Sequence, residues 1–572
     1  MKIHSMLPAR LQAETAAAAV DWQSNNKVAR FWAHDAALWT NSDEAQWLGW
    51  LDIVERQQKD LVHFRALAED TRLEGFQHAL LLGMGGSSLC PEVLALTFGR
   101  QKGFPHLQIV DSTDPAQISA IEQTLDLKKT IVIVSSKSGS TLEPNILKQY
   151  FFARMQQAVG AENAGSHFLA VTDPGSKMEQ VAKADHFRKI FYGDASIGGR
   201  YSALSNFGMV PAAVMGLDVE KLLAQAKVAV DACKNTTVAE NPGVQLGLIM
   251  GAAANAGRDK LTIFTSPEIY DLGAWLEQLL AESTGKQGKG ITPVDREQIA
   301  PPEHYGADRV FAYLRLECGD NAAMDAATEK LAQAGHPVVR LEMQQKYDIG
   351  QQFFLWEIAT AVAGSVIGIN AFNQPDVEAS KIETKRLTSE YEASGKLPEN
   401  APIFEDAGIR LYAGKLYAAT LQGALAAGKA DLAAYLRAHF SQIKAGDYFA
   451  TLAYVPMNAQ HEEVLQHFRH AVRDKKRVAT CLGFGPRFQH STGQDYKGGP
   501  NTGVFVQVTA DHAQDLAVPG QKYTFGVVIA AQAAGDLAVL DQRGRRALRV
   551  HLGKDVEAGL KKLDAAILKA LG

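Results

Sequence analysis

Two segments rich in glycine and hydroxyl side chains, each directly after a short apolar run, contain residue types that bind phosphate. The first is LLLGMGGSSL, in which an apolar stretch runs into Gly85, Gly86 and Ser87. Glycine lets the backbone approach an anion closely, and the N-terminus of a following helix favours negative charge. Such a turn is also common where a helix and a strand simply pack tightly. The segment by itself therefore leaves a phosphate site and a packing turn equally open.

The second segment, TIVIVSSKSGSTLEPN, places five hydroxyl groups and one lysine after another apolar run. Hydroxyl and N–H groups can surround a phosphate dianion, whereas a helix N-cap needs only one such hydroxyl. The segment lacks the GxxxxGK[ST] pattern of a Walker-type nucleotide loop. We therefore predict phosphate contacts at both segments. The predicted contact residues are Gly86, Ser87, Ser136, Lys137, Ser138 and Thr141.

The elements that must position these residues follow an α/β pattern, in which short apolar runs alternate with amphipathic stretches, as in a parallel sheet. The expected strands form three series: HALLLG, HLQIV, TIVIVSS, HFLAVTD and KIFYGD; then LTIFTS, RVFAYLRL and PVVRLEM; then TLAYVP, RVATCLGF, GVFVQVT, FGVVIAA and RALRVHL. We predict a helical N-terminal segment (1–75), two parallel-sheet α/β domains (76–240 and 241–385) and a C-terminal α/β domain (386–572). The polar stretch 381–406 is interpreted as a connection.

Composition limits the class of protein. The chain has 572 residues, 46% of them hydrophobic and 21% charged, with a formal net charge of −5. These values are typical of a soluble protein with several domains and give no reason to expect a nucleic acid as partner. The N-terminus has no export signal, and no run of eighteen uncharged apolar residues appears, so we expect a cytoplasmic protein. Four scattered cysteines without a CxxC pair indicate neither a zinc site nor a disulfide framework.

Five sequence boxes in order resemble those of the glucose-6-phosphate isomerase family, which is built on sugar isomerase (SIS) domains. The boxes are GMGGSSL, SSKSGSTLEP, IGGRYSALS, AESTGKQGKG and GINAFNQPDVEASK. The overall layout is similar to the isomerase half of bifunctional transaldolase/glucose-6-phosphate isomerase proteins. No transaldolase barrel precedes the boxes, so we expect isomerase activity alone.

The resemblance implies reversible conversion of glucose 6-phosphate into fructose 6-phosphate through a cis-enediol(ate), with no metal ion or cofactor. It assigns the proton-transferring base to Glu282, and a carboxylate is suited to that task at neutral pH. It matches Arg200 to a fixed cation that stabilises the enediolate, Lys381 to a lysine that assists ring opening, and Gln374 to a substrate contact. The substrate is then a small hexose phosphate.

The histidine expected to open the sugar ring departs from the family pattern. In ordinary bacterial members an LHSxGQ segment lies between the glutamate and lysine boxes, where this chain has only His304 and His336. A match appears later, in RFQHSTGQ, so we assign the role to His490 and keep His304 as the alternative. The ordinary family takes this histidine from a neighbouring subunit. The protein is therefore expected to be either a monomer with its histidine in cis or a homodimer.

Three other functions compete with this interpretation. His467 and His470 could face one metal ion from a helix, but the HExxH pattern is absent and a solvated helix face is favoured. A non-catalytic SIS protein that senses a sugar phosphate would keep the phosphate segments without needing Glu282. An isomerase that also accepts mannose 6-phosphate stays open.

Overall fold

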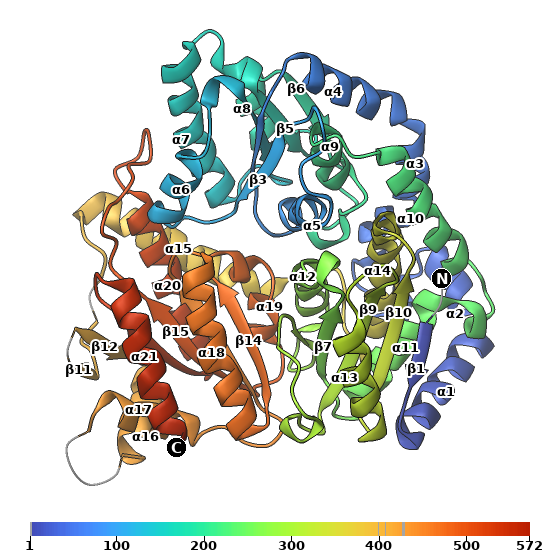
Figure 1. The fold of residues 1–572 in the computed structure, drawn as a ribbon, viewed down its shortest axis with the longest axis vertical. Helices are drawn as coiled ribbons and strands as arrows, with labels where there is room; N and C mark the ends of the chain where they lie inside the picture. Colours follow the sequence, from blue (N-terminus) through green and yellow to red (C-terminus); the bar gives the residue numbers. More distant parts are fainter. Residues whose placement is uncertain (1–2, 399, 407, 426–429) are drawn as a thin grey trace.

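Three sheets, each covered by helices, make up the computed structural model of the protein, which describes residues 3–398, 400–406, 408–425 and 430–572 (Figure 1). The mixed architecture of mostly parallel sheets and covering helices confirms the predicted fold class.

The first sheet is entirely parallel, in the order β3-β2-β4-β5-β6. Its strands are β2 (His78–Leu82), β3 (His106–Val110), β4 (Thr130–Ser135), β5 (Phe168–Thr172) and β6 (Lys189–Tyr192). The helices in this part of the chain are α5 (Leu89–Phe98), α6 (Pro115–Glu122), α7 (Leu142–Val159), α8 (Lys177–Ala184), α9 (Asn206–Val214) and α10 (Val219–Cys233). Because the carboxyl ends of parallel strands meet at one sheet edge, β2 and β4 deliver both predicted phosphate segments to the same edge.

The second sheet has the order β1-β10-β9-β7-β8 and is parallel except for β1. Its strands are β1 (Ile3–Met6), β7 (Lys260–Thr265), β8 (Thr292–Val294), β9 (Arg309–Leu316) and β10 (Val338–Met343). The helices in this part of the chain are α11 (Pro242–Asn255), α12 (Leu272–Thr284), α13 (Ala322–Gln333), α14 (Ile349–Ile367) and α15 (Pro375–Ser394). The N-terminal segment, expected to be wholly helical, thus contributes an edge strand to this sheet.

The remaining N-terminal helices are α1 (Ala9–Ser24), α2 (Lys27–Trp32), α3 (Ile53–Lys59) and α4 (Leu61–Leu73). Two tryptophans between α2 and α3 pack inward. Trp39 donates its indole N–H to the carbonyl of Ala361 on α14 at 2.8 Å, and Trp50 stacks on Tyr201 with ring centroids 5.0 Å apart. The N-terminal segment therefore supports α14 and the turn that contains Tyr201.

The C-terminal sheet has the order β11-β12-β16-β15-β13-β14, with a parallel interior and an antiparallel β11–β12 edge. Its strands are β11 (Phe404–Asp406), β12 (Ile409–Tyr412), β13 (Tyr448–Tyr454), β14 (Ala479–Phe484), β15 (Gly503–Thr509) and β16 (Arg546–His551). Its helices are α16 (Lys415–Gly423), α17 (Leu432–Phe440), α18 (Ala459–Lys476), α19 (Gly493–Gly498), α20 (Phe525–Gln542) and α21 (Val556–Leu571).

Two further sequence-based assignments were wrong. FGVVIAA, expected to be a strand, forms the start of α20, where the Thr524 hydroxyl accepts the backbone N–H of Val527 as an N-cap. A short apolar run does not distinguish a strand from a buried helix, and here the apolar pattern continues through 18 residues. Helix α20 is long and apolar enough to cross a membrane, but 61% of that window is buried inside the protein.

The other wrong assignment is the expected connection over 381–406. Its first part continues α15, which has Pro375 in its first turn and ends at Gly395 in the left-handed conformation. Proline at the start and glycine just past the end are standard helix boundaries, and the breakers that suggested a connection lie beyond Gly395. Helix α15 packs along α20 and so links the second domain to the C-terminal domain.

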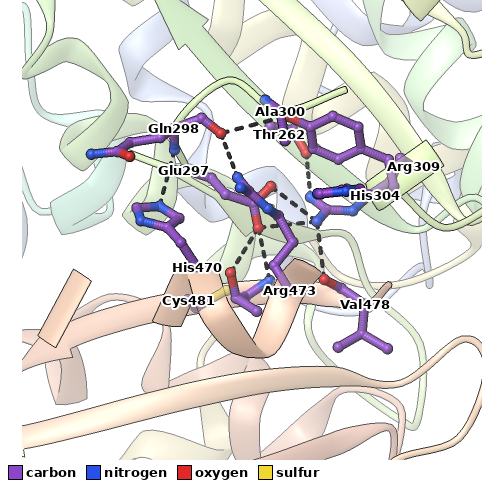
Figure 2. A network of polar contacts seen from close by, with 12 residues as sticks. Thr262, Glu297, Gln298, Ala300, His304, Arg309, His470, Arg473, Val478 and Cys481 are labelled. Atoms are coloured by element: carbon purple, nitrogen blue, oxygen red, sulfur yellow. Dashed lines mark hydrogen bonds and ion pairs between the residues drawn. The ribbon is translucent and has the colours of Figure 1, made fainter. Parts of the chain in front are cut away.

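A buried network centred on Glu297 joins the same two domains elsewhere (Figure 2). The Glu297 carboxylate accepts a hydrogen bond from Arg309 at 3.0 Å, and from the backbone N–H and hydroxyl of Thr480 at 3.1 and 2.7 Å. Arg309 also donates to the carbonyl of Val478 at 3.2 Å. Since Thr480 and Val478 belong to the C-terminal domain, the network fixes that domain against the second sheet.

Candidate active site

The glycine-rich turn after β2 brings two other segments of the site into contact. A Cβ atom on Gly86 would lie 2.0 Å from the carbonyl oxygen of Gly199, and one on Gly85 would lie 2.9 Å from that of His490. Gly85 also has a positive φ of 56°. Only glycine allows such close backbone approach. Packing thus requires these glycines, and the adjacent Ser87 is buried at the same place.

Arg200 lies in the turn that packs on Gly86 and is held in one position by four acceptors. Its Nη2 donates to the carbonyls of Ala371 and Asn373 at 2.7 and 3.1 Å, and its Nη1 donates to Gln374 Oε1 at 3.0 Å. Its Nε donates to Ser283 Oγ at 2.7 Å. The guanidinium is therefore preorganised, and the structure places the predicted residues Arg200 and Gln374 in direct contact.

Glu282 lies in the last turn of α12, beside this guanidinium. Its Oε2 is 3.7 Å from Arg200 Nη1 and accepts a hydrogen bond at 3.1 Å from Gln278, one helical turn earlier. Gln278 also donates to the backbone carbonyl of His490 at 2.9 Å. The carboxylate side chain is only 10% exposed. Gln278 thus connects the predicted base to the segment that contains the predicted histidine.

His490 ends a short 3₁₀ turn, Arg487–His490, and reaches the first domain. Its Nε2 lies 3.0 Å from Oε1 of Glu143, which also accepts a 2.6 Å hydrogen bond from Gln532. Burial raises the pKa of Glu143, but the charges of His490 and Lys381 and the hydrogen bond from His490 outweigh burial, so the pKa lies below its ordinary value. An ionised Glu143 accepts the Nε2–H, which leaves Nδ1 as the ring nitrogen able to exchange a proton.

Arg487 anchors the histidine segment to the first domain. Its guanidinium forms ion pairs with Glu92 at 2.6 Å and with Asp111 at 2.8 Å. Asp111 also accepts a hydrogen bond from the hydroxyl of Ser88, directly after the glycine-rich turn, at 3.1 Å. The phosphate turn and the His490 segment therefore share one buried ion-pair network.

A cavity of about 840 Å³ lies between the first domain, α15 and the C-terminal domain, and we call it the active-site cavity. Ser138, Thr141, Glu143, Lys381 and His490 all line it. Its volume lies within the range of pockets that hold small molecules. The predicted residues Ser138, Thr141 and Lys381 thus line one cavity together with His490. Five other predicted site residues do not line it: Gly86, Ser87, Arg200, Glu282 and Gln374.

Two residues of the predicted phosphate segment take other positions. Lys137 pairs with Asp173 and donates to the carbonyl of Asp194 at 2.8 Å, and it does not line the active-site cavity. The Ser136 hydroxyl is buried and has no hydrogen-bond partner within the described part of the chain. Like Lys137, Ser136 does not line the active-site cavity.

His304, the alternative histidine, lies elsewhere. It pairs with Asp474 of α18 at 2.8 Å and stands beside the Glu297 network (Figure 2). The two histidines of α18 also have separate partners. His467 contacts Asp564 at 2.9 Å, and His470 accepts the backbone N–H of Gln298 at 3.0 Å. None of these three rings lines the active-site cavity.

Three polar residues of the site were missed by sequence reasoning. Glu143 lies inside the SSKSGSTLEP box, where a carboxylate in the first helical turn was a usable signal. Gln278 precedes Glu282 by four residues on α12, so both lie on one helix face. Gln532 had no signal, because its helix was taken for a strand.

The chain is similar to known sugar-phosphate isomerases. The family model described as phosphoglucose isomerase matches residues 66–299. The glucose-6-phosphate isomerase of Rubrobacter xylanophilus is 31% identical over 379 residues, which cover 57% of this chain and 86% of that protein. The probable glucose-6-phosphate isomerase of Methanococcus maripaludis is 28% identical over 369 residues, covering 58% of this chain and 82% of that protein.

Two solved structures share the fold. A hypothetical protein from Thermus thermophilus superposes with a TM-score of 0.56 and 25% identity, covering 67% of this chain and 99% of its own. A glucose-6-phosphate isomerase from Chlamydia trachomatis gives a TM-score of 0.50 and 21% identity, covering 63% of this chain and 76% of its own.

Proposed function

The chain belongs to the glucose-6-phosphate isomerase family, and on this basis we propose that it interconverts glucose 6-phosphate and fructose 6-phosphate by proton transfer, without a metal ion or organic cofactor. One observation carries the proposal. Gln278 hydrogen-bonds both the Glu282 carboxylate and the backbone of His490. This contact links the proposed base to the chain segment of the proposed ring-opening histidine, which supports one shared site built from two different sheets.

The phosphate group binds at the end of the active-site cavity formed by Ser138 and Thr141. These residues directly precede α7, an 18-residue helix whose N-terminal dipole favours an anion. We expect further donors from the neighbouring strand ends: the Ser136 hydroxyl, which has no hydrogen-bond partner among the described residues, and the backbone around Gly86 and Ser87.

Ring opening breaks the bond between the anomeric carbon and the ring oxygen, which needs one proton delivered to the ring oxygen and one removed from the anomeric hydroxyl. His490 is the proton-exchanging group, with Glu143 holding its Nε2 so that Nδ1 can act. Lys381 lines the same cavity and places a positive charge near the oxygen atoms where negative charge develops.

Isomerisation follows on the open-chain aldose. Glu282 removes the proton from C2, the electrons form a C1–C2 double bond, and negative charge passes to the carbonyl oxygen. Arg200 stabilises that charge with a guanidinium that stays protonated and whose position its acceptors fix. Glu282 then returns the proton to C1 while the O2 proton passes to O1. The carboxylate ends in its starting state.

We further propose that each chain completes its own site. The support is that the contacts of His490 with Glu143 and Gln278 all lie within one chain. The C-terminal domain then replaces the neighbouring subunit that supplies the histidine in ordinary members.

Tritium exchange tests the chemistry. Fructose 6-phosphate incubated with the wild-type protein in tritiated water should gain tritium at C1 and yield glucose 6-phosphate. Glu282→Gln should exchange about 10² to 10⁴ times more slowly, the range for a lost general base, while still binding the sugar. A wild-type protein that binds fructose 6-phosphate without exchange would be a sensor, and labelled mannose 6-phosphate would indicate a dual isomerase.

A further inference from the structure

A second cavity, separate from the active-site cavity, lies between the second domain and the C-terminal domain. It has a volume of about 500 Å³ and shares no lining residue with the active-site cavity. Four cationic side chains line it: Lys286, Lys497, Arg543 and Arg545. We call it the basic cavity.

Two of these cations already have carboxylate partners. Lys497 pairs with Asp536 at 2.6 Å, and Arg543 pairs with Asp376 at the start of α15. Their charges are balanced within the protein, so they do not by themselves call for a ligand.

Lys286 and Arg545 are different, because neither has an ion-pair partner among the residues that the structure describes. Lys286 is 3% exposed, and its Nζ donates only to the carbonyl of Asn370, at 2.6 Å. Burial, with Arg200 nearby, holds the pKa of Lys286 well below its ordinary value. An uncompensated buried cation is costly, and proteins normally pair it or lose its charge.

Arg545 is 7% exposed and donates from Nη2 to the carbonyls of Lys497 and Gly499, at 2.5 and 2.8 Å. Its Nε is buried and has no hydrogen-bond partner in the described part of the chain. Arg545 therefore lines the cavity with a guanidinium that no carboxylate of the described residues pairs with.

We propose that the basic cavity is a second anion site, which binds a phosphate monoester dianion: inorganic phosphate or the phosphoryl group of a small sugar phosphate. Guanidinium and ammonium groups are the usual phosphate ligands, and a bound phosphate dianion would favour the protonated form of Lys286. Pro375, at the N-terminus of the 20-residue helix α15, also lines the cavity and adds a favourable dipole. The volume leaves room for a small organic group beside the phosphate.

This inference does not depend on the proposed catalytic activity, but the two sites are neighbours. Lys286 follows Glu282 by four residues, and α15 continues from the basic cavity to Lys381. An anion in the basic cavity would therefore restrain the turn after Glu282 and the start of α15, the helix that carries Lys381.

Lys286→Met tests the proposal, with Lys289→Met as the matched control. Lys289 belongs to the same turn and also donates to a carbonyl, that of Ile367 at 2.9 Å, but it is exposed and does not line the cavity. Thermal unfolding is measured in inorganic phosphate, in fructose 6-phosphate and in chloride at equal ionic strength. Binding at the active-site cavity is common to all three proteins and cancels in the comparison.

In chloride, Lys286→Met should be at least as stable as the wild type, because it lacks an uncompensated buried charge. In phosphate, the wild type and Lys289→Met should gain more in Tm than Lys286→Met does. Calorimetric titration should find two phosphate sites per wild-type chain, the second weakened about tenfold or more in Lys286→Met, as expected for a lost charge-assisted hydrogen bond. Arg545→Gln should weaken the same site.

The two ligand arms identify the source of the phosphoryl group. A Lys286-dependent shift with inorganic phosphate indicates a phosphate site, and one with fructose 6-phosphate alone indicates a sugar-phosphate site. Equal phosphate shifts in the wild type, Lys286→Met and Lys289→Met, together with a single titrated site on the wild type, would overturn the proposal.

Discussion

Glu297 and Glu143 are both buried carboxylates that hold the C-terminal domain against the rest of the protein, yet they stand in different surroundings. The Glu297 side chain is 0% exposed and contacts Arg309, which is also 0% exposed (Figure 2). The Glu143 side chain is 5% exposed, contacts His490 and borders the active-site cavity. Burial raises the pKa of each carboxyl group, but cationic neighbours and hydrogen bonds together lower it more. The pKa of both Glu297 and Glu143 therefore lies below its ordinary value.

The difference lies in the partner. Arginine stays protonated at any working pH, so the Glu297–Arg309 pair is a permanent link whose function is structural. Histidine exchanges protons near neutral pH, so the Glu143–His490 pair can orient a group that takes part in a reaction. The two contacts have the same nitrogen–oxygen distance, 3.0 Å, and both carboxylates are buried. The contact with arginine thus serves stability, and the contact with histidine is proposed to serve the reaction.

The largest expected effect on turnover within this comparison comes from removing the histidine. His490→Ala should lower kcat by about 10² to 10⁴-fold, the range for a lost acid–base group. Because each chain is proposed to complete its own site, a mixture of His490→Ala and Glu282→Ala proteins should stay inactive. Recovered activity in the mixture, measured by a coupled isomerase assay, would show that two chains share one site.

Glu143→Gln should have a smaller effect, about 10-fold to 100-fold on kcat with little change in KM. The amide keeps the shape of the side chain but removes the charge that supports His490 when it accepts a proton. Glu143→Asp should recover part of the loss. Steady-state kinetics of both variants check this, and equal kcat for Glu143→Gln and the wild type would contradict an orienting role.

Glu297→Gln should leave kcat within about twofold but should lower the free energy of unfolding by about 3 to 5 kcal/mol, because it leaves Arg309 buried without its counter-ion. The charges of Arg309 and Arg469 hold the folded-state pKa of Glu297 below its ordinary value. The ionised form therefore stabilises the fold above the ordinary carboxyl pKa, and this contribution is lost as pH falls through the lower folded-state pKa. Urea unfolding from pH 7 to pH 3 should show a flatter profile for the variant.

The smallest effect is expected for His304→Ala. Its ring contacts Asp474 beside the Glu297 network and lines no part of the active-site cavity. Since its side chain is 31% exposed, the ion pair should contribute under about 1 kcal/mol to stability. Turnover should stay within about twofold of the wild type, and a hundredfold loss would reassign the ring-opening role to His304.

Much of the site could be predicted because its parts are local. A strand end followed by Ser138 and Thr141 has its shape set by neighbouring residues, and the run from Gly85 to Ser87 needs only the backbone freedom of glycine. Helix α20 could not be predicted, because a buried helix and a buried strand share the same apolar composition. Gln532, which donates to Glu143 from that helix, was missed for the same reason.

The sequence by itself determined which residue types stand at each strand end and helix end, because these depend on contacts a few residues apart. It indicated His490 without identifying what that histidine contacts. Only the tertiary structure decided that His490 meets Glu143 and Gln278, and that Lys286 and Arg545 face one cavity. These contacts join segments from different domains, so they arise from how whole sheets pack against one another and leave no periodicity in the chain.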